Sequence, residues 1–334
     1  MTVQVVTGNH AAGYALSAAG EANRTARGAA CGIYPITPQT EIVEFVARFP
    51  FSKGRVVPVE SEHSAMAVSI GASLGGARAF TASTTNGLAY MTDNVMVAGY
   101  YRLPIVMVAV NRTLGPPWNI WADQGDTLML RDFAWLQFYC ETNQEVLDTT
   151  LLAFRLAEDH RILLPVLTCM DAFIVSHTQT ETTLPEQKLV DSYLPDLDLP
   201  HRLHHDQART IGGMVWPHED LSQRLDIDEA MKRVPGVYQE CRQSFREVFG
   251  RDPGEGSPVQ RVVIPSSLSL ALGLLPGITP HIRSGGFVHG RELPASGPGR
   301  HPGTVIHAGN DDASRDYVVA TQVLPGRGGV PGAN

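Results

Sequence analysis

The stretch YPITPQT, residues 34–40, separates a short apolar run from an amphipathic one. Pro35 and Pro38 lie on either side of Thr37, and proline fixes φ and restricts the residue before it, so the backbone stops there and presents a hydroxyl. Further along, ESEHS at residues 60–64 places two acids where an extended run gives way to a helix of small residues. We therefore expect a stiff turn and an acidic helix start, with a helix over 42–49 and a strand over 56–59 between them.

Strand and helix signals alternate along the first half of the chain. Short apolar runs predict strands, and Ala-rich or amphipathic stretches predict the helices between them. The run PIVMVAV at residues 104–110 is apolar throughout, which is typical of a strand buried on both faces. The alternation predicts an α/β fold with a mostly parallel sheet and helices on both faces. The expected strands are 29–34, 56–59, 77–82, 104–110 and 163–169, and the expected helices are 11–22 (capped by Asn9), 42–49, 64–76, 87–100 and 151–158.

The composition limits the class of partner. The 334 residues carry a net charge of -8, and 43% of them are hydrophobic, which suffices for a sizeable core. Lysine occurs only as Lys53, Lys188 and Lys232, so there is no polybasic tract. We therefore expect neither nucleic acid nor a membrane as a partner.

The N-terminal sequence and the spacing of the cysteines indicate the cellular compartment of the protein. Residues 1–10 lack the basic and apolar regions of a secretory signal, and no apolar run is long enough to span a bilayer. Cys31, Cys140, Cys169 and Cys241 are scattered and form no CxxC pair, which argues against a zinc ribbon or an iron–sulfur cluster on this chain. We expect a soluble cytoplasmic protein.

Composition divides the chain into three segments. Residues 1–183 carry the strand–helix alternation, and residues 184–257 form an extended connection followed by one or two charged surface helices over 220–249. Residues 258–334 are rich in proline and glycine, lack lysine and show little periodicity. Such a segment buries too little surface to offset chain entropy, so we expect a disordered tail or an aberrant, truncated domain. A reading-frame slip in a GC-rich gene is an alternative origin.

Residues 65–76, AMAVSIGASLGG, predict a helix of unusually small side chains. Such a helix has poor intrinsic propensity but allows a neighbouring backbone to approach closely. Tight packing against the sheet is the simpler explanation. A helix that packs against a partner subunit or a cofactor is the alternative.

Polar side chains lie where an open α/β sheet binds ligands, beyond the carboxyl ends of its strands. The Thr37 hydroxyl is immobilised between two prolines and suits ligand binding, with a helix N-cap as the structural alternative. Glu60 or Glu62, at a helix start, would exchange a proton with a ligand if it were partly buried. Arg112 follows the strand 104–110 and suits bidentate capture of a carboxylate, with a surface salt bridge as the alternative.

The loop 116–126 contains two tryptophans, an asparagine and two acids. Loops this rich in aromatic residues are usually functional. Asp123 and Asp126 are too weak a pair to predict a metal site, and we expect no metal on this chain. His177 is a candidate acid or base, but a lone histidine is more often structural.

Four segments taken in order resemble one family: YPITPQTE (34–41), VESEHSAMAVSIGASLGGARAFTASTTNGL (59–88), LPIVMVAVNRTLGPPWNIWADQGD (103–126) and DAFIVSH (171–177). They are similar to the α subunit of the 2-oxoacid:ferredoxin oxidoreductases, most specifically of pyruvate:ferredoxin oxidoreductase. The resemblance runs over residues 6–249 and fails beyond residue 260, where the family continues with a second α/β domain.

The resemblance implies a thiamine diphosphate-binding fold with a pyrimidine-type domain. It implies an enzyme that decarboxylates pyruvate oxidatively to acetyl-CoA and CO2 and passes electrons to ferredoxin. Glu62 would be the catalytic glutamate that hydrogen-bonds N1′ of the aminopyrimidine, with Tyr34 and Pro35 beside the cofactor. Thr37 would contact the substrate, and Arg112 would bind its carboxylate. A branched-chain 2-oxoacid substrate and a non-catalytic truncated homologue are the alternatives.

The resemblance also implies that the chain is active only with partner subunits of β, γ and δ type. The β-type subunit would share the thiamine diphosphate and hold its Mg2+. The 4Fe-4S clusters would lie on partner subunits and not on this chain. Pyruvate, coenzyme A and ferredoxin complete the expected partners.

Overall fold

The structure is a computed structural model that describes residues 1–253 and four short strands, 261–263, 290–291, 304–308 and 317–321. The predictions made for residues 258–334 lie outside the described residues, apart from these strands. The domain boundaries expected after residues 183 and 257 stay predictions.

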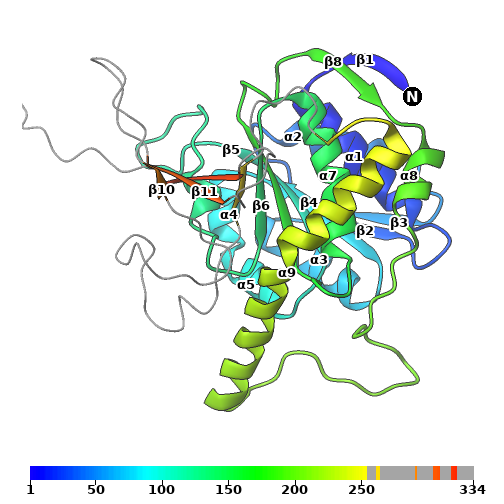
Figure 1. Cartoon of the computed structure of the whole chain (residues 1–334), viewed down its shortest axis with the longest axis vertical. Helices are drawn as coiled ribbons and strands as arrows, with labels where there is room; N and C mark the ends of the chain where they lie inside the picture. The colour runs from blue at the N-terminus through cyan, green and yellow to red at the C-terminus, as the bar shows by residue number, and fades with distance from the viewer. Residues whose placement is uncertain (254–260, 264–289, 292–303, 309–316, 322–334) are drawn as a thin grey trace, which may run out of the picture.

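A seven-stranded sheet forms the centre of the molecule (Figure 1). Its strands are β2 (Ala29–Ile33), β3 (Gly54–Pro58), β4 (Arg78–Ser83), β5 (Val106–Asn111), β6 (Leu136–Cys140), β7 (Val166–Asp171) and β9 (Arg261–Val263). They are ordered β3-β2-β4-β5-β7-β6-β9, and every neighbouring pair is parallel except β6 and β9. The predicted mostly parallel sheet is therefore confirmed.

Helices cover both faces of this sheet, as predicted. The described helices are α1 (Gly8–Ala22), α2 (Thr40–Arg48), α3 (Glu62–Leu74), α4 (Thr85–Tyr90), α5 (Thr92–Tyr100), α6 (Gly125–Leu128), α7 (Asn143–Ala157), α8 (Gln187–Tyr193) and α9 (Pro217–Phe249). One hydrophobic core joins the sheet to α1, α2, α7, α8 and α9, and a second joins its other face to α3, α4 and α5.

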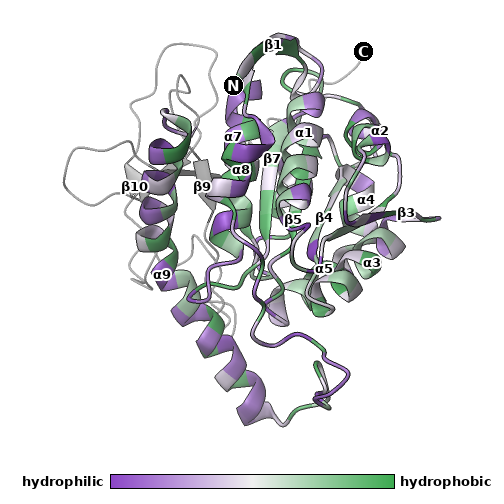
Figure 2. Cartoon of the chain, turned by 90° about the vertical axis from the view of Figure 1, so that its right-hand side faces the viewer, coloured by the Kyte–Doolittle hydropathy of each residue, from purple (hydrophilic) through white to green (hydrophobic). Residues whose placement is uncertain are grey.

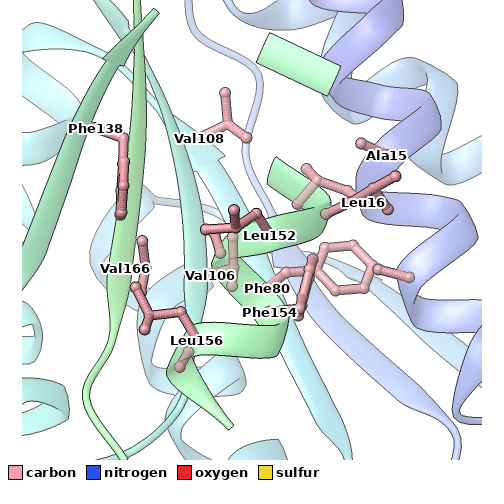
Figure 3. Close-up of a cluster of buried hydrophobic side chains, with 14 of the residues drawn as sticks. Ala15, Leu16, Phe80, Val106, Val108, Phe138, Leu152, Phe154, Leu156 and Val166 are labelled. Carbon is pink, nitrogen blue, oxygen red and sulfur yellow. The ribbon is translucent and has the colours of Figure 1, made fainter. Parts of the chain in front are cut away.

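The central strand β5 shows why its sequence is apolar at every position. Successive side chains of a strand point to opposite faces of the sheet. Val106 and Val108 lie in the first core, and Met107 and Ala109 lie in the second, all fully buried. Figure 3 shows Val106 and Val108 in the first core together with Leu152 of α7. Each fully buried valine or methionine side chain contributes roughly 1.5–3 kcal/mol.

The first helix begins earlier than predicted. Thr7, not Asn9, is its N-cap, because the Thr7 side chain accepts a hydrogen bond from the His10 N–H at 3.2 Å. Asn9 is buried and instead donates to the Pro38 carbonyl oxygen at 2.8 Å. The side chain expected to cap α1 therefore ties that helix to the turn that follows β2.

Two other helices differ from the predicted ranges. The helix expected over 87–100 is interrupted at Met91, so that α4 and α5 are separate helices. The helix expected to begin at residue 151 begins at Asn143, because the Thr142 hydroxyl caps it by accepting from the Glu145 N–H at 3.1 Å. Strand β6 was not predicted, because its sequence LQFYC mixes polar and apolar residues in a short run.

The connection after the sheet is more ordered than predicted. It contains α8, and the charged helical region is the single helix α9, which continues past Pro235. The end of α9 packs on α8, where the Tyr193 hydroxyl donates to the Cys241 carbonyl oxygen at 3.2 Å. The start of α9 is hydrophilic and projects from the sheet (Figure 2). No helix in the described ranges is both long and apolar enough to cross a membrane.

Two small antiparallel sheets accompany the main one. In the first, β1 (Thr2–Val6) pairs with β8 (Thr180–Leu184), which joins the N-terminus to the end of the α/β region. In the second, the order is β10 (Gly290–Arg291), β11 (Thr304–Ala308) and β12 (Tyr317–Thr321). Neither sheet is among the predicted elements.

The small residues of α3 permit a close approach to the sheet. A Cβ added to Gly32 of β2 would lie only 2.3 Å from the carbonyl oxygen of Ala65, so the strand and the helix fit because neither carries bulk there. Tight packing therefore accounts for one side of α3. Ala67 and Gly71 on its other side are exposed, and a Cβ added to Gly71 would meet nothing within 4 Å.

Candidate functional site

The candidate site lies at the carboxyl edge of the parallel sheet. The chain passes from β2 outward to β3 and then crosses back through α3 to β4 on the other side of β2. Such a reversal of strand order leaves a crevice beyond the carboxyl ends of the two strands. The segments that follow β2, β3, β4 and β5 carry the predicted site residues.

Glu62 is the first residue of α3. Ser61 caps this helix by accepting from the Ser64 N–H at 3.2 Å, and the helix N-terminus favours a negative charge. Glu62 is only 7% exposed, and its carboxylate accepts no hydrogen bond from any residue that the structure describes. A carboxylate in a mostly buried position without a donor is suited to a ligand that supplies an N–H group.

Glu60 differs from Glu62 in every one of these respects. It is exposed and accepts a hydrogen bond from the Ser64 hydroxyl at 2.6 Å. That hydrogen bond lowers the pKa of Glu60. Of the two acids that the sequence left open, Glu62 is thus the one in a buried environment.

Gly87 of α4 lies directly against the Glu62 carboxylate. A Cβ at this position would lie 2.4 Å from the Ser83 Oγ and 2.8 Å from Oε1 of Glu62. The Ser83 hydroxyl is itself buried and has no hydrogen-bond partner in the described structure. Sequence reasoning missed Gly87 and Ser83, although both fall inside the TASTTNGL segment that carries the family resemblance.

Thr37 and Arg112 lie together, although they follow strands on either side of β4. Nη1 of Arg112 donates to the Thr37 carbonyl oxygen at 2.7 Å. Nε of Arg112 is buried and has no partner among the residues described. Burial lowers the pKa of Arg112, and the negative charge of Asp126 opposes that effect. The surface salt bridge considered for Arg112 is not what the structure shows.

The turn after β2 places Thr37 at the carboxyl edge of the sheet. Helix α2 begins at Thr40 with Gln39 as its N-cap, so the alternative in which Thr37 caps this helix is wrong. Thr37 and Pro35 are exposed, and Tyr34 is partly buried. Gln39 fixes the turn, because its Nε2 donates to the Tyr34 carbonyl oxygen at 2.8 Å.

Asp126 is fully buried beneath Arg112. Its carboxylate accepts from the backbone N–H groups of Thr85 and Arg112 and from Nδ2 of Asn111. Burial raises the pKa of Asp126 to about 7, although these hydrogen bonds act to lower it. Asp123 has a different role, because its Oδ1 accepts from the Gly125 N–H at 2.7 Å at the start of α6.

His177 is held on both sides of its ring. Nδ1 lies 2.8 Å from the Ser176 Oγ, and Nε2 lies 3.2 Å from Oε1 of Glu41. The ring also packs on Phe173 at a centroid distance of 4.7 Å. These contacts account for His177 as a residue that fixes the loop after β7.

A cluster of exposed apolar side chains borders the site. Trp118 and Trp121 are each 63% exposed, in the loop that begins at Arg112. Ile174, in the loop after β7, is 60% exposed, and Trp121 packs on the neighbouring Phe173 at 6.3 Å. Apolar side chains gathered in this way are typical of a surface that another molecule covers.

A possible metal-ligand group lies elsewhere. His204, His205 and Asp206 place their ligand atoms within 4.8 Å of one another in the connection before α9. Desolvation and the charges of His205 and Arg202 lower the pKa of His204, so the surroundings of this group are positive. A positive environment disfavours a cation, and we assign no metal there.

Residues 21–243 match the protein family described as pyruvate flavodoxin/ferredoxin oxidoreductase, thiamine diphosphate-binding. The chain belongs to this family. The resemblance inferred from the sequence is thereby confirmed, and the fold is that of a thiamine diphosphate-binding domain.

Members of the family with assigned names are similar over most of this chain. A pyruvate synthase subunit PorA of Methanothermobacter thermautotrophicus is 39% identical over 257 residues, which cover 76% of this chain and 65% of that protein. A ketoisovalerate oxidoreductase subunit VorA of Pyrococcus abyssi is 42% identical over 257 residues, covering 75% and 62%. The chain thus spans less than two thirds of the length of these curated relatives.

A solved structure agrees on the fold. A 2-oxoglutarate:ferredoxin oxidoreductase from Magnetococcus marinus superposes with a TM-score of 0.56 at 21% identity, covering 70% of this chain and 45% of that one. The roles expected for the five site residues of this family member stay predictions: Tyr34, Pro35, Thr37, Glu62 and Arg112.

Proposed function

We propose that this chain is the α subunit of a pyruvate:ferredoxin oxidoreductase. The complex would convert pyruvate and coenzyme A to acetyl-CoA and CO2 and pass two electrons to ferredoxin. The observation that carries the proposal is the buried Glu62 carboxylate, which lacks a hydrogen-bond donor and lies at the carboxyl edge of a thiamine diphosphate-binding fold. Similarity to pyruvate synthase subunits supports the choice of substrate.

The residues present fit the pyrimidine of thiamine diphosphate. Glu62 would accept a hydrogen bond from its protonated N1′, and Gly87 carries no side chain that would clash with the Glu62 carboxylate. When bound, the cofactor supplies the nucleophilic carbon that attacks a 2-oxo group and stabilises the charge left by decarboxylation. The protein's part is to hold a proton at the Glu62 carboxylate and to fix the orientation of the ring.

The substrate would bind across the Thr37–Arg112 pair. Arg112 is a charged donor fork at a strand end, which suits the carboxylate of a 2-oxoacid. The exposed Thr37 hydroxyl makes no hydrogen bond within the described residues, so it is available to the substrate. Tyr34 and Pro35, earlier in the same turn, would line the cofactor side.

These residues would form one side of a site that a second subunit completes. A β-type subunit would bring the diphosphate and Mg2+ sites and would cover the exposed Trp118, Trp121 and Ile174 that border Arg112. The 4Fe-4S clusters would lie on β-, γ- or δ-type partners. All four cysteines of this chain are buried free thiols, and burial raises the pKa of Cys31 and of Cys241 to about 12. Such thiols are poorly disposed to bind iron. A cytoplasmic location would follow from use of ferredoxin and coenzyme A.

A branched 2-oxoacid is the second candidate substrate. The ketoisovalerate oxidoreductase subunit of Pyrococcus abyssi is 42% identical, which is as similar as the pyruvate synthase subunits. Arg112 and Glu62 would act on the groups that both substrates share, so these residues do not discriminate between them.

Coexpression with β-, γ- and δ-type subunits tests the proposal. The purified complex should reduce a low-potential viologen dye when pyruvate, coenzyme A and thiamine diphosphate are all present. Faster reduction with 2-oxoisovalerate would assign the branched-chain activity instead. Failure of this chain to co-elute with the β-type subunit in size-exclusion chromatography would favour a non-catalytic homologue.

A further inference from the structure

We propose that Asp126 is a positioning residue that holds Arg112 and the start of α4 in place on the two sides of the site. The inference deepens the proposed function and rests on it for the identity of the substrate. Asp126 is fully buried and therefore acts on the site through other residues.

The carboxylate of Asp126 joins the exits of two neighbouring strands. Oδ2 accepts from the Arg112 N–H at 3.1 Å, just after β5, and from the Thr85 N–H at 3.0 Å, just after β4. Oδ1 accepts from Nδ2 of Asn111 at 2.7 Å. Charge-assisted hydrogen bonds to buried backbone donors are stronger than neutral ones. One side chain thus fixes the separation of two loops that both leave the carboxyl edge of the sheet.

Thr85 shows why an anchor is needed on the β4 side. Its φ of 36° is in the left-handed region, which a β-branched residue rarely adopts, so the surrounding contacts must hold it there. The Asp126 carboxylate binds its N–H, and the Thr85 hydroxyl donates to the Thr113 carbonyl oxygen at 2.7 Å. Thr85 is the first residue of α4, and Gly87 of the same turn lies against Glu62. Through Thr85 and Arg112, Asp126 therefore supports the cofactor side of the site as well as the substrate side.

Asp126 also provides the negative charge that opposes the cost of burying Arg112. Burial lowers the pKa of Arg112, and Asp126 raises it. Among the described residues, Asp126 also interacts with the titratable groups Tyr139 and Cys169. Burial is the main cause that raises the pKa of each of these two groups well above its normal value. Both therefore stay neutral near pH 7. Because burial raises the pKa of Asp126 to about 7, the anchor gains charge across the neutral range.

Hydrogen exchange of the full chain tests the anchor without requiring activity. In Asp126→Ala, peptides covering residues 84–88 and 110–114 should exchange about tenfold faster or more than in the wild type, which is what loss of one hydrogen bond predicts. Asp123→Ala removes a carboxylate from the same loop and should leave both peptides unchanged. Equal exchange of these peptides in the two variants would overturn the inference.

Kinetics of the whole complex tests the link to the substrate. Asp126→Asn keeps one acceptor oxygen but removes the charge, so we expect the KM for the 2-oxoacid to rise about tenfold, with kcat changed less than about threefold. Its KM should also lose the wild-type rise below pH 7. A kcat loss at unchanged KM, or a wild-type KM that is flat from pH 6 to 8, contradicts the inference. A wild-type complex that turns over no 2-oxoacid refutes the proposed function instead, and hydrogen exchange still decides the role of Asp126.

Discussion

The guanidinium of Arg112 and the backbone carbonyl of Thr37 are joined by a hydrogen bond of 2.7 Å, although the two residues are 75 positions apart. Thr37 follows β2 and Arg112 follows β5, and β4 lies between these strands. The bond therefore crosses the end of one strand and fixes the direction of the arginine. A guanidinium held by one N–H keeps other donors for a ligand.

Replacing Arg112 by lysine tests whether the planar shape of the guanidinium, and not only its charge, binds the substrate. Lysine keeps the positive charge but loses the planar fork that binds a carboxylate with two parallel hydrogen bonds. We expect the KM for pyruvate to rise by about 10–100-fold with a smaller change in kcat, since one charged hydrogen bond is worth about 1.5–3 kcal/mol. Steady-state dye reduction by the complex measures both constants. Arg48→Lys, on the exposed face of α2, is the control, and an unchanged KM would remove Arg112 from the carboxylate site.

Glu62→Gln tests the acid that we propose to bind the cofactor. Glutamine preserves the shape but cannot hold the shared proton, and positioned acid–base groups typically contribute 10²–10⁴-fold, so we expect kcat to fall by about that factor. Glu60→Gln is the matched control, because Glu60 is exposed and two residues away. Both variants should elute as the wild-type complex. Full activity in Glu62→Gln would show that this carboxylate takes no part in catalysis.

Two glycine substitutions test the close contact between Gly87 and the Glu62 carboxylate. Gly87→Ala would place a methyl group 2.8 Å from Oε1 of Glu62, so the carboxylate must move, and thiamine diphosphate binding should weaken by about tenfold or more. Gly71→Ala meets nothing within 4 Å and should instead stabilise the exposed part of α3 by about 0.5–1 kcal/mol. Isothermal titration with the cofactor measures the first effect, and urea unfolding measures the second. Equal cofactor affinity in the two variants would contradict the assigned position of Gly87.

The strands β2, β3, β4, β5 and β7 could be predicted from the sequence because each carries a local apolar pattern, whereas β6 was not predicted. The apolar run of β5 predicted a doubly buried strand, and polar residues after strand ends predicted the edge of the sheet that carries the candidate site. Capping was less predictable: Thr7 and Asn9 are both good caps, and contact of Asn9 with the Pro38 carbonyl oxygen decided between them. That contact joins distant segments, so a local pattern does not contain it.

The structural roles of the residues that support the site could not be predicted from the sequence for the same reason. Asp123 and Asp126 look alike in the sequence, yet Asp123 accepts from the Gly125 N–H at the start of α6, whereas Asp126 is buried under Arg112. Their difference arises from where β4 and β5 place Thr85 and Arg112. The need for a glycine at position 87 likewise arises only because α4 packs against Glu62 at the start of α3.

Arg78 should be important for stability and not for the reaction. It is fully buried, and its Nε and Nη2 each lie 2.6 Å from a carboxylate oxygen of Glu158, with Nη1 bound to the Ala19 carbonyl oxygen. Arg78→Ala leaves the Glu158 carboxylate, 10% exposed, without its partner, and loss of one partner of a buried pair typically costs about 3–5 kcal/mol. Urea unfolding of the chain measures the loss. Arg48→Ala removes an exposed ion pair with Glu44 and should cost less than about 0.5 kcal/mol.

Asp126 should make the stability of the chain depend on pH. Burial raises its pKa from 3.8 in the unfolded chain to about 7, so between these values the folded state binds a proton that the unfolded state does not. The stability from this group is therefore fully present below pH 3.8 and is lost as the pH rises to about 7, by at most about 1.4 kcal/mol per pH unit. Urea unfolding at pH 5, 6, 7 and 8 should show a decline in the wild type that Asp126→Asn lacks, whatever the absolute stability of the variant. Parallel pH curves for the two proteins would show that Asp126 is charged throughout this range. Because the charged form is the better anchor for Arg112, the same ionisation that costs stability would improve substrate binding.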